Sequence, residues 1–271
     1  MALQGLSLYA RKNSYGITGG CQHSSVDVPL WALPVVIAVL SYTVQNSCGF
    51  GVCGQRGCRG GHAMSAQGFF LITDITGYTS FLTQSELEHA QYIIEELFTC
   101  QLNALDDRLM VSNFQGDAIL CYLPLMPSGN GRVVLKNINA LYKAFKDKIE
   151  QMTVAPPCRC GACSTIGLLD IKMFLHFGEY VVKHLGEREE LMGPDVIVAH
   201  RMMKNTVVEN TGISSYLLIS EAAREQMNGD MGSLATLDYA DTYAHIGRVK
   251  MSVARLSDME SVTHSAPGHE A

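Results

Sequence analysis

Charged side chains are scarce in this sequence. They make up 17% of its 271 residues, below the ~25% that is usual for a soluble domain. Acidic residues outnumber basic ones 26 to 20, which gives a net charge of −6. This balance excludes a nucleic-acid binder that depends on bulk positive charge. Hydrophobic residues reach 47%, enough for a large core, so a wholly disordered chain is excluded as well.

The number and spacing of the cysteines also give no sign of a disulfide scaffold. The nine cysteines are odd in number, are not spaced like a small disulfide framework, and lie in a chain too long to need one. We therefore expect a reducing compartment, which means a cytoplasmic location. The thiols would then be core residues, metal ligands or redox sites.

The first quarter of the chain differs from the rest. Its apolar run Val28–Val44 has 17 residues, no charge and two prolines, at the bottom of the ~17–25 residues of a spanning helix. It can be interpreted as a membrane anchor, as an unusual signal sequence, or as an extension that never had to fold. Association with a membrane is expected only if residues 28–44 are a real anchor.

Glycine-rich sequence separates this run from the remainder of the chain. Because Gly49–His62 is typical of a flexible segment, we expect Met64 to begin the functional domain. The sequence thus predicts a poorly structured extension over residues 1–67, a folded domain over 68–256 and a flexible tail over 257–271.

Hydrophobic periodicity predicts alternating strands and helices in the folded domain. Ser85 and Glu88 suggest a capping box at the start of the first long helix. The expected helices are Ser85–Leu105, Val133–Met152, Met192–Asn205 and Glu221–Met227. The expected strands are Gly68–Thr76, a pair in Leu109–Leu125, a hairpin in Leu169–Leu185 that turns near Gly178, Ser215–Ser220, and one or two in Leu234–Leu256. This order predicts an α/β sandwich with a mostly antiparallel sheet.

Two aspartates lie where predicted strands meet turns. Asp74 interrupts the first apolar strand, and Asp117 sits in the tight turn of the following hairpin. A carboxylate among apolar residues is costly unless it is paired or binds a metal, and adjacent strands would bring both together as ligands for Mg²⁺. The segment Ile75–Phe81 opens a helix, whose free N–H groups favour phosphate. The alternative is that Asp74 caps the helix and Asp117 is a turn residue.

Four segments in order resemble the catalytic domain of class III nucleotidyl cyclases. The resemblance covers about Phe69 to Leu256 and is closer still to a group of uncharacterised bacterial proteins built on that domain. It implies a ferredoxin-like cyclase homology domain, with helices packed on a mostly antiparallel sheet. The matching segments are FFLITDITGYTSFL with its metal-binding aspartate, FQGDAILCYLP, LHFGEYV, and the arginine helix MGPDVIVAHRMMKN.

The resemblance implies a role for individual residues. Asp74 and Asp117 would hold two Mg²⁺ or Mn²⁺ ions, assisted by the Ile75 carbonyl, and Arg201 would neutralise the triphosphate in the transition state. The remaining nucleotide contacts would come from Gly77, Tyr78, Thr79, Asn113 and Glu190.

This sequence departs from the cyclase pattern at three positions. Ile197 stands where the asparagine that orients the ribose is expected, and isoleucine cannot donate a hydrogen bond. Asn113 replaces the lysine or glutamate of the first purine-reading position, and Glu190 falls at the second, where Asp, Thr or Cys would be expected. An amide both donates and accepts, so the choice between ATP and GTP stays open.

Two functions follow from the resemblance. The first is conversion of a purine nucleoside triphosphate to a 3′,5′-cyclic nucleotide by a head-to-tail homodimer. The alternative is a regulatory module that binds metal and nucleotide without turnover, as Ile197 suggests.

A cysteine cluster outside the cyclase pattern supports a third function, a zinc or thiol interaction domain. Cys158, Cys160 and Cys163 follow two prolines in a C-x-C-x-x-C arrangement, which lets three thiolates converge on a soft cation such as a structural Zn²⁺. Redox chemistry and simple reduced thiols are the alternatives. No fourth ligand is evident; the candidates are Cys121, His176, His184 or a partner chain.

Overall fold

The computed structural model describes residues 64–259, apart from residues 128, 157, 159, 187, 228, 229, 232 and 233. The predicted anchor at residues 28–44 lies outside the described residues, as does most of the predicted tail. The domain boundaries after residues 67 and 256 therefore stay predictions. Within the described part of the chain, no helix has the length and apolar character needed to cross a membrane.

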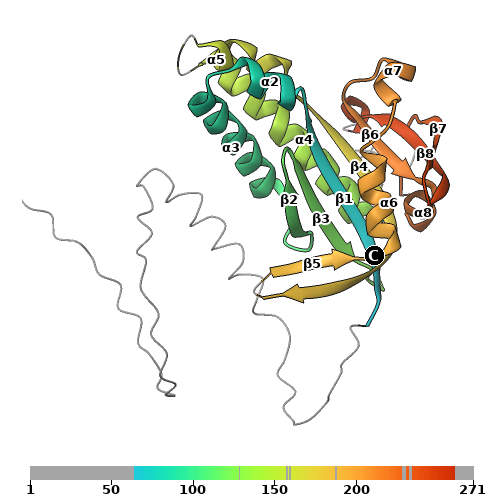
Figure 1. The fold of residues 1–271 in the computed structure, drawn as a ribbon. Helices are drawn as coiled ribbons and strands as arrows, with labels where there is room; N and C mark the ends of the chain where they lie inside the picture. Colours follow the sequence, from blue (N-terminus) through green and yellow to red (C-terminus); the bar gives the residue numbers. More distant parts are fainter. Residues whose placement is uncertain are drawn as a thin grey trace, which may run out of the picture. The chain divides into compact units, whose positions relative to one another are not determined.

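The described residues form an eight-stranded sheet in the order β2-β3-β1-β4-β6-β8-β7, with β5 paired to β4 (Figure 1). Every pairing is antiparallel except that of β4 with β6. The predicted α/β fold with a mostly antiparallel sheet is confirmed. The strands are β1 (Ala66–Thr76), β2 (Met110–Gln115), β3 (Ala118–Pro124), β4 (Asp170–Leu185), β5 (Arg188–Met192), β6 (Tyr216–Ser220), β7 (Leu237–Tyr243) and β8 (Gly247–Arg255).

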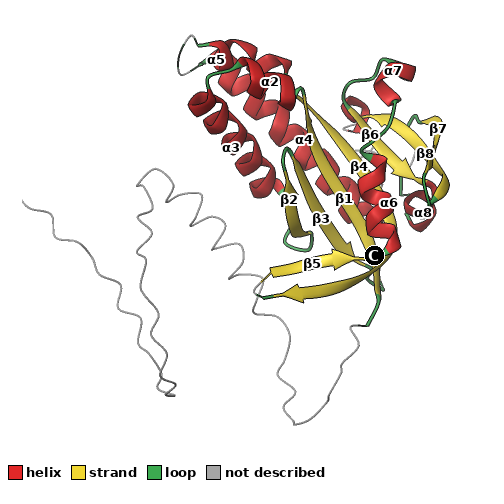
Figure 2. Cartoon of the chain, viewed as in Figure 1, coloured by secondary structure: helices red, strands yellow, loops and turns green. Residues whose placement is uncertain are grey.

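Helices cover both faces of this sheet (Figure 2). Helices α2 to α5 and α8 pack on one face, here called the α4 face, and α6 and α7 pack on the other, the α6 face. The helices are α2 (Tyr78–Gln84), α3 (Leu87–Ala104), α4 (Gly131–Val154), α5 (Gly161–Thr165), α6 (Pro194–Met202), α7 (Val207–Thr211) and α8 (Glu221–Gln226).

The central strand β1 is apolar along its whole middle because both of its faces are buried. Phe69 and Leu71 belong to the core under α4, whereas Phe70 and Ile72 belong to the core under α6. Side chains alternate between the faces of a strand, so Asp74 shares the α6 face with Phe70 and Ile72.

The hairpin predicted within Leu169–Leu185 is wrong. Residues Asp170–Leu185 form the single long strand β4, and the chain turns only after it, before β5. Gly178 has another role: the Asp195 carboxyl group of α6 occupies the space that a Cβ at this position would fill. The backbone N–H of Glu179 donates to this carboxylate at 2.7 Å, so the glycine serves helix docking.

The predicted capping box is also wrong. Helix α3 begins at Leu87, two residues later than expected, and no side chain caps it. The nearby carboxylate of Glu86 instead accepts hydrogen bonds from the backbone N–H groups of Gly161 and Ala162, at 3.3 and 3.2 Å. The start of α3 is therefore tied to α5 rather than capped by its own sequence.

Candidate functional site

The ends of two neighbouring strands bring Asp74 and Asp117 together. Strand β1 pairs with β3 so that Asp74 lies opposite Ala118, the residue after Asp117. The backbone N–H of Ile75 donates to the carbonyl oxygen of Asp117 at 3.3 Å. Gly116, with φ of 62°, permits the tight turn between β2 and β3 in the left-handed region that glycine favours.

Burial and the neighbouring Asp117 change the ionisation of Asp74. The pKa of Asp74 is raised from 3.8 to about 6, first because the group is partly buried, then because Asp117 is negatively charged and hydrogen bonds with it. Lys172, directly opposite Asp74 on β4, acts against this shift and favours the ionised form. Asp74 therefore keeps its proton at slightly acidic pH.

This donor set fits a divalent metal ion. Two adjacent, half-buried carboxyl groups supply hard oxygen ligands, and their mutual repulsion is the kind that a cation removes. One lysine opposite Asp74 does not neutralise both charges. The roles of these residues as metal ligands stay a prediction that the geometry favours.

Two polar residues near Asp74, Tyr216 and Asn205, already form hydrogen bonds within the chain. Tyr216 is buried, and its hydroxyl donates to Asn205 Oδ1 at 2.9 Å. That oxygen also accepts from the backbone N–H of Val207, while Asn205 Nδ2 donates to the Met202 carbonyl. Asn205 therefore lacks the free amide that would let it take over the ribose contact missing at position 197.

The segment expected to hold the triphosphate begins α2. Gly77 has φ of 88° and precedes the helix, Tyr78 is half-buried and Thr79 is exposed. Helix α2 has only seven residues, so its dipole gives little support to an anion. Phosphate binding by these residues, and metal binding by the Ile75 carbonyl, stay predictions.

The two purine-reading positions lie on different strands. Asn113 is half-buried at a register shift of β2, and its side-chain oxygen is buried without a hydrogen-bond partner. Glu190 is exposed on β5, opposite Lys183. Asn113 lies opposite Leu120, which pairs with Ile72 close to the Asp74 end of the sheet, whereas Glu190 pairs with Lys183 near the far end of β4. The structure does not bring the two residues together within one chain. Neither choice of base follows from this arrangement.

Helix α6 carries the other two residues of the predicted site. Ile197 is 53% exposed, and Arg201 is exposed in the last turn. An exposed apolar side chain at position 197 contributes no polar contact within its own chain. The guanidinium of Arg201 is accessible to an anion, as its predicted role requires.

A buried histidine fastens α6 to the sheet. His176 Nδ1 lies 2.8 Å from Ser220 Oγ, and its Nε2 lies 3.5 Å from Asp195 Oδ1. Burial lowers the pKa of His176 despite this carboxylate. Ser220 is 1% exposed and caps α8, so a substrate does not reach its hydroxyl. His176 therefore has a structural role in this fold.

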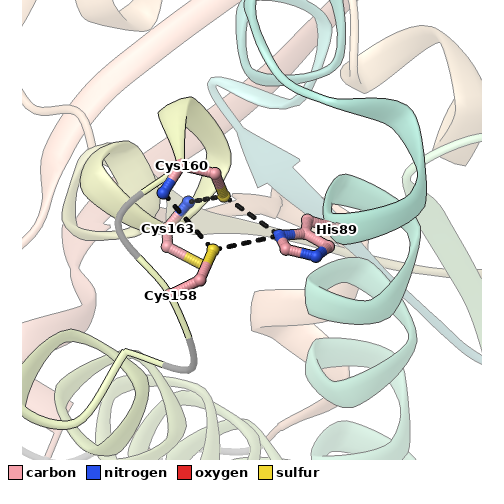
Figure 3. Close-up of side chains that lie close together, drawn as sticks. All are labelled: His89, Cys158, Cys160 and Cys163. Carbon is pink, nitrogen blue, oxygen red and sulfur yellow. Dashed lines mark hydrogen bonds between the residues drawn. The ribbon is translucent and has the colours of Figure 1, made fainter.

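A histidine, His89, lies beside the three cysteines of the cluster (Figure 3). Potential ligand atoms of His89, Cys158, Cys160 and Cys163 all lie within 4.8 Å of one another. His89 belongs to the first turn of α3 and is separated by 69 residues from Cys158, so sequence spacing gave no sign of it.

The fourth ligands considered from the sequence are engaged elsewhere. Cys121 is buried in the core on β3, His176 contacts Ser220, and His184 lies 3.4 Å from Glu189. The structure thus replaces these three candidates by His89.

Comparison with known proteins gives relatives without an assigned activity. A family model described as "Protein of unknown function (DUF2652)" matches residues 94–211, less than half of the chain. The "Uncharacterized protein Rv2561/Rv2562" of Mycobacterium tuberculosis is 30% identical over 129 residues, which are 47% of this chain and 58% of that protein. This chain therefore aligns with little more than half of the curated relative's length.

Solved structures similar to this fold include cyclase domains and a cyclase-like protein. The adenylyl cyclase CyaB from P. aeruginosa matches with a TM-score of 0.54 and 15% identity, over 70% of this chain and 94% of that one. The guanylyl cyclase Cya2 matches with a TM-score of 0.53 and 15% identity, over 71% and 92%.

A third structure is a class III adenylyl cyclase-like ATP-binding protein from Pseudomonas aeruginosa. Its TM-score is 0.52 at 13% identity, over 73% of this chain and 40% of that one. At these identities the similarity establishes the architecture alone. The described domain has the fold of class III nucleotidyl cyclase catalytic domains.

Proposed function

We propose that this domain binds a purine nucleoside triphosphate together with divalent cations, Mg²⁺ or Mn²⁺, at Asp74 and Asp117. The observation that carries the proposal is the pair of half-buried carboxyl groups at adjoining strand ends, where burial and then the charge of Asp117 raise the pKa of Asp74 to about 6. The similarity to the ATP-binding protein from Pseudomonas aeruginosa supports the same ligand class.

In this proposal, different residues of the chain contact the cations and the triphosphate. Asp74 and Asp117 hold the cations, and the cations in turn hold the negatively charged phosphates. Lys172, which faces Asp74 from β4, stabilises the ionised carboxylate and keeps it ready to bind. Arg201 is exposed on α6 and supplies a second positive charge for a triphosphate.

Calorimetry with non-hydrolysable ATP and GTP analogues tests this function. We expect heat of binding in the presence of Mn²⁺, no heat without a divalent cation, and at least a tenfold weaker affinity in Asp74→Asn and Asp117→Asn. Asp147→Asn, which changes an exposed aspartate of α4, is the matched control and should bind as the wild type does. Absence of heat with both analogues and either cation would reject the proposal.

Cyclisation of the bound nucleotide is the second candidate function. When bound, the cations would lower the pKa of the ribose 3′-hydroxyl and offset charge on the phosphates. Arg201 would stabilise the charge that develops during the attack. Ile197 offers no hydrogen bond to orient the ribose, so we propose that any turnover of the wild-type chain is slow.

A head-to-tail homodimer is part of this proposal. In the family that the sequence resembles, the metal-binding aspartates and the arginine come from opposite subunits. This chain carries Asp74, Asp117 and Arg201 once each, so two copies would complete two sites. Similar solved structures support the fold required for such a dimer.

A further inference from the structure

We propose that His89, Cys158, Cys160 and Cys163 form a tetrahedral Zn²⁺ site that fastens the α4–α5 connection to the beginning of α3. This site is separate from the cation–nucleotide site and uses none of its residues. Three thiolates and one imidazole are among the ligand sets of structural zinc in proteins.

The distances within the cluster fit one small cation. Cys158 Sγ and Cys163 Sγ are 3.6 Å apart, whereas Zn–S bonds of ~2.3 Å at a tetrahedral angle separate two sulfurs by about 3.8 Å. His89 Nδ1 lies 3.1 Å from Cys160 Sγ and 3.2 Å from Cys158 Sγ. With a Zn–N bond of ~2.0 Å and a Zn–S bond of ~2.3 Å, the tetrahedral N···S separation is about 3.5 Å, a few tenths of an ångström longer than these two distances.

The local backbone is arranged around the sulfurs. The N–H of Cys160 donates to Cys158 Sγ at 3.3 Å, and the N–H of Cys163 donates to Cys160 Sγ at 3.4 Å. Such donors stabilise the negative charge of metal-bound thiolates and orient them. The C-x-C-x-x-C segment therefore supplies backbone hydrogen-bond donors to the sulfurs as well as the three thiols.

A carboxylate reinforces the same connection. Glu86, three residues before His89, accepts from the N–H groups of Gly161 and Ala162 at the start of α5. The chain thus joins α3 to α5 twice, once through Glu86 and once through the proposed metal. This arrangement suits a structural site, because α5 has only five residues and depends on such anchors.

The alternative of a disulfide fits the geometry less well. The three cysteines are free, and the 3.6 Å between Cys158 and Cys163 is far longer than the ~2.05 Å of a disulfide bond. A redox pair also has no need of a histidine that approaches two of the sulfurs. Cys163 is buried, and Cys158 and Cys160 pack against the core of the α4 face, which shields the site from solvent on that side.

Metal analysis of the full chain, purified without chelators, tests the proposal. Inductively coupled plasma mass spectrometry should find about one zinc per chain in the wild type. His89→Ala and Cys160→Ser should lose most of it, and Co²⁺ added to metal-free wild type should give the visible absorption of a tetrahedral thiolate site, altered in His89→Ala. Cys100→Ser and His184→Ala, which change residues outside the cluster, should keep the zinc.

Cysteines elsewhere in the chain need their own control. A variant with Cys48, Cys53 and Cys58 all changed to Ser should retain the zinc, which separates the proposed site from the glycine-rich segment. If Cys160→Ser fails to fold, protection of the three thiols against alkylation by zinc in the wild type gives the same answer. Zinc-free protein with freely alkylated thiols, a disulfide within the cluster, or full zinc content in His89→Ala overturns the proposal. None of these outcomes bears on nucleotide binding.

Discussion

At the scale of single residues, Asp74 is the side chain whose chemistry the fold changes most clearly. Its neighbours on β1 are buried, and its own burial together with the charge of Asp117 raises the pKa of its carboxyl group to about 6. Ionisation of this carboxyl therefore costs free energy in the folded chain and little in the unfolded one. A cation bound at the proposed site would offset this cost.

The free energy of unfolding should consequently fall as the pH rises from the pKa of Asp74 in the unfolded chain, 3.8, to its pKa in the folded chain, about 6. Between 3.8 and about 6 the folded chain keeps a proton that the unfolded chain has released, so protonation favours folding there and the benefit is lost near neutral pH. Asp74→Asn removes this dependence. We expect its melting temperature, relative to wild type, to be higher at pH 7.5 than at pH 4.5 in buffer free of added Mg²⁺ and Mn²⁺.

The comparison with wild type matters because other groups titrate in this range. Burial lowers the pKa of His176 and of His200, which makes stability increase with pH, opposite to the effect of Asp74. Both contributions are present in either chain and cancel in the difference. An unchanged difference between pH 4.5 and 7.5 would contradict the assigned role of Asp74.

Ile197 provides the residue-scale test of turnover. Asn at this position supplies the amide that the cyclase pattern contains, and one transition-state hydrogen bond is worth about tenfold or more in rate. We expect Ile197→Asn to form cyclic nucleotide at least about tenfold faster than wild type, measured by chromatography with Mn²⁺. Val208→Asn, which changes an exposed apolar residue of α7, should give no increase. Equal rates in all three chains would argue against cyclisation.

At the scale of elements, the docking of α6 depends on glycine and on buried polar contacts. Gly178 leaves room for Asp195, whose carboxylate receives the N–H of Glu179 and approaches His176. His176 in turn contacts Ser220, the cap of α8. One buried imidazole thereby connects β4 with α6 and with the start of α8.

Gly178→Ala tests this docking directly. The added Cβ collides with the Asp195 carboxyl group, and overpacking of this kind costs about 1–3 kcal/mol. Gly167→Ala is the control, since its Cβ finds no atom nearer than 3.8 Å. Urea unfolding should show a clear loss of stability for Gly178→Ala and little change for Gly167→Ala. Similar stability of the two variants would show that α6 adjusts freely.

At the scale of the whole molecule, the two candidate sites use opposite faces of one sheet. Asp74 lies on the α6 face, whereas Cys163 belongs to the core of the α4 face. The exposed apolar side chains Leu185, Met192 and Ile197, which are 47%, 53% and 53% exposed, come from the β4–β5 hairpin and α6. In the proposed head-to-tail dimer, we expect the second copy to pack against these elements.

A dimer that uses this surface should respond to charge placed on it. Light scattering after size exclusion should give the mass of two chains for wild type, and Met192→Asp should shift the mass toward one chain, because burying a carboxylate in an apolar interface is costly. Leu168→Asp changes a still more exposed apolar residue, 77% exposed, beside α5 and should leave the dimer intact. Dimers of equal strength in both variants would place the interface elsewhere.

The sequence by itself determined the fold class, the strands and helices with strong periodicity, and the approach of Asp74 to Asp117. These features depend on the hydrophobic pattern of each segment and on the pairing of strands that are close in the sequence. The structure was needed where distant segments meet. The sequence predicted a turn at Gly178. In the structure a glycine is needed there because the Asp195 carboxyl group of α6 occupies the space of a Cβ.

His89 shows the same limit for the cysteine cluster. Its partner Cys158 is 69 residues away, and no spacing rule connects a helix's first turn with a loop on the same face of a sheet. Only tertiary packing decides such a contact, because the position of α5 against α3 follows from the core beneath both. The three thiols were predictable from the sequence, while the imidazole that completes the set of four was not.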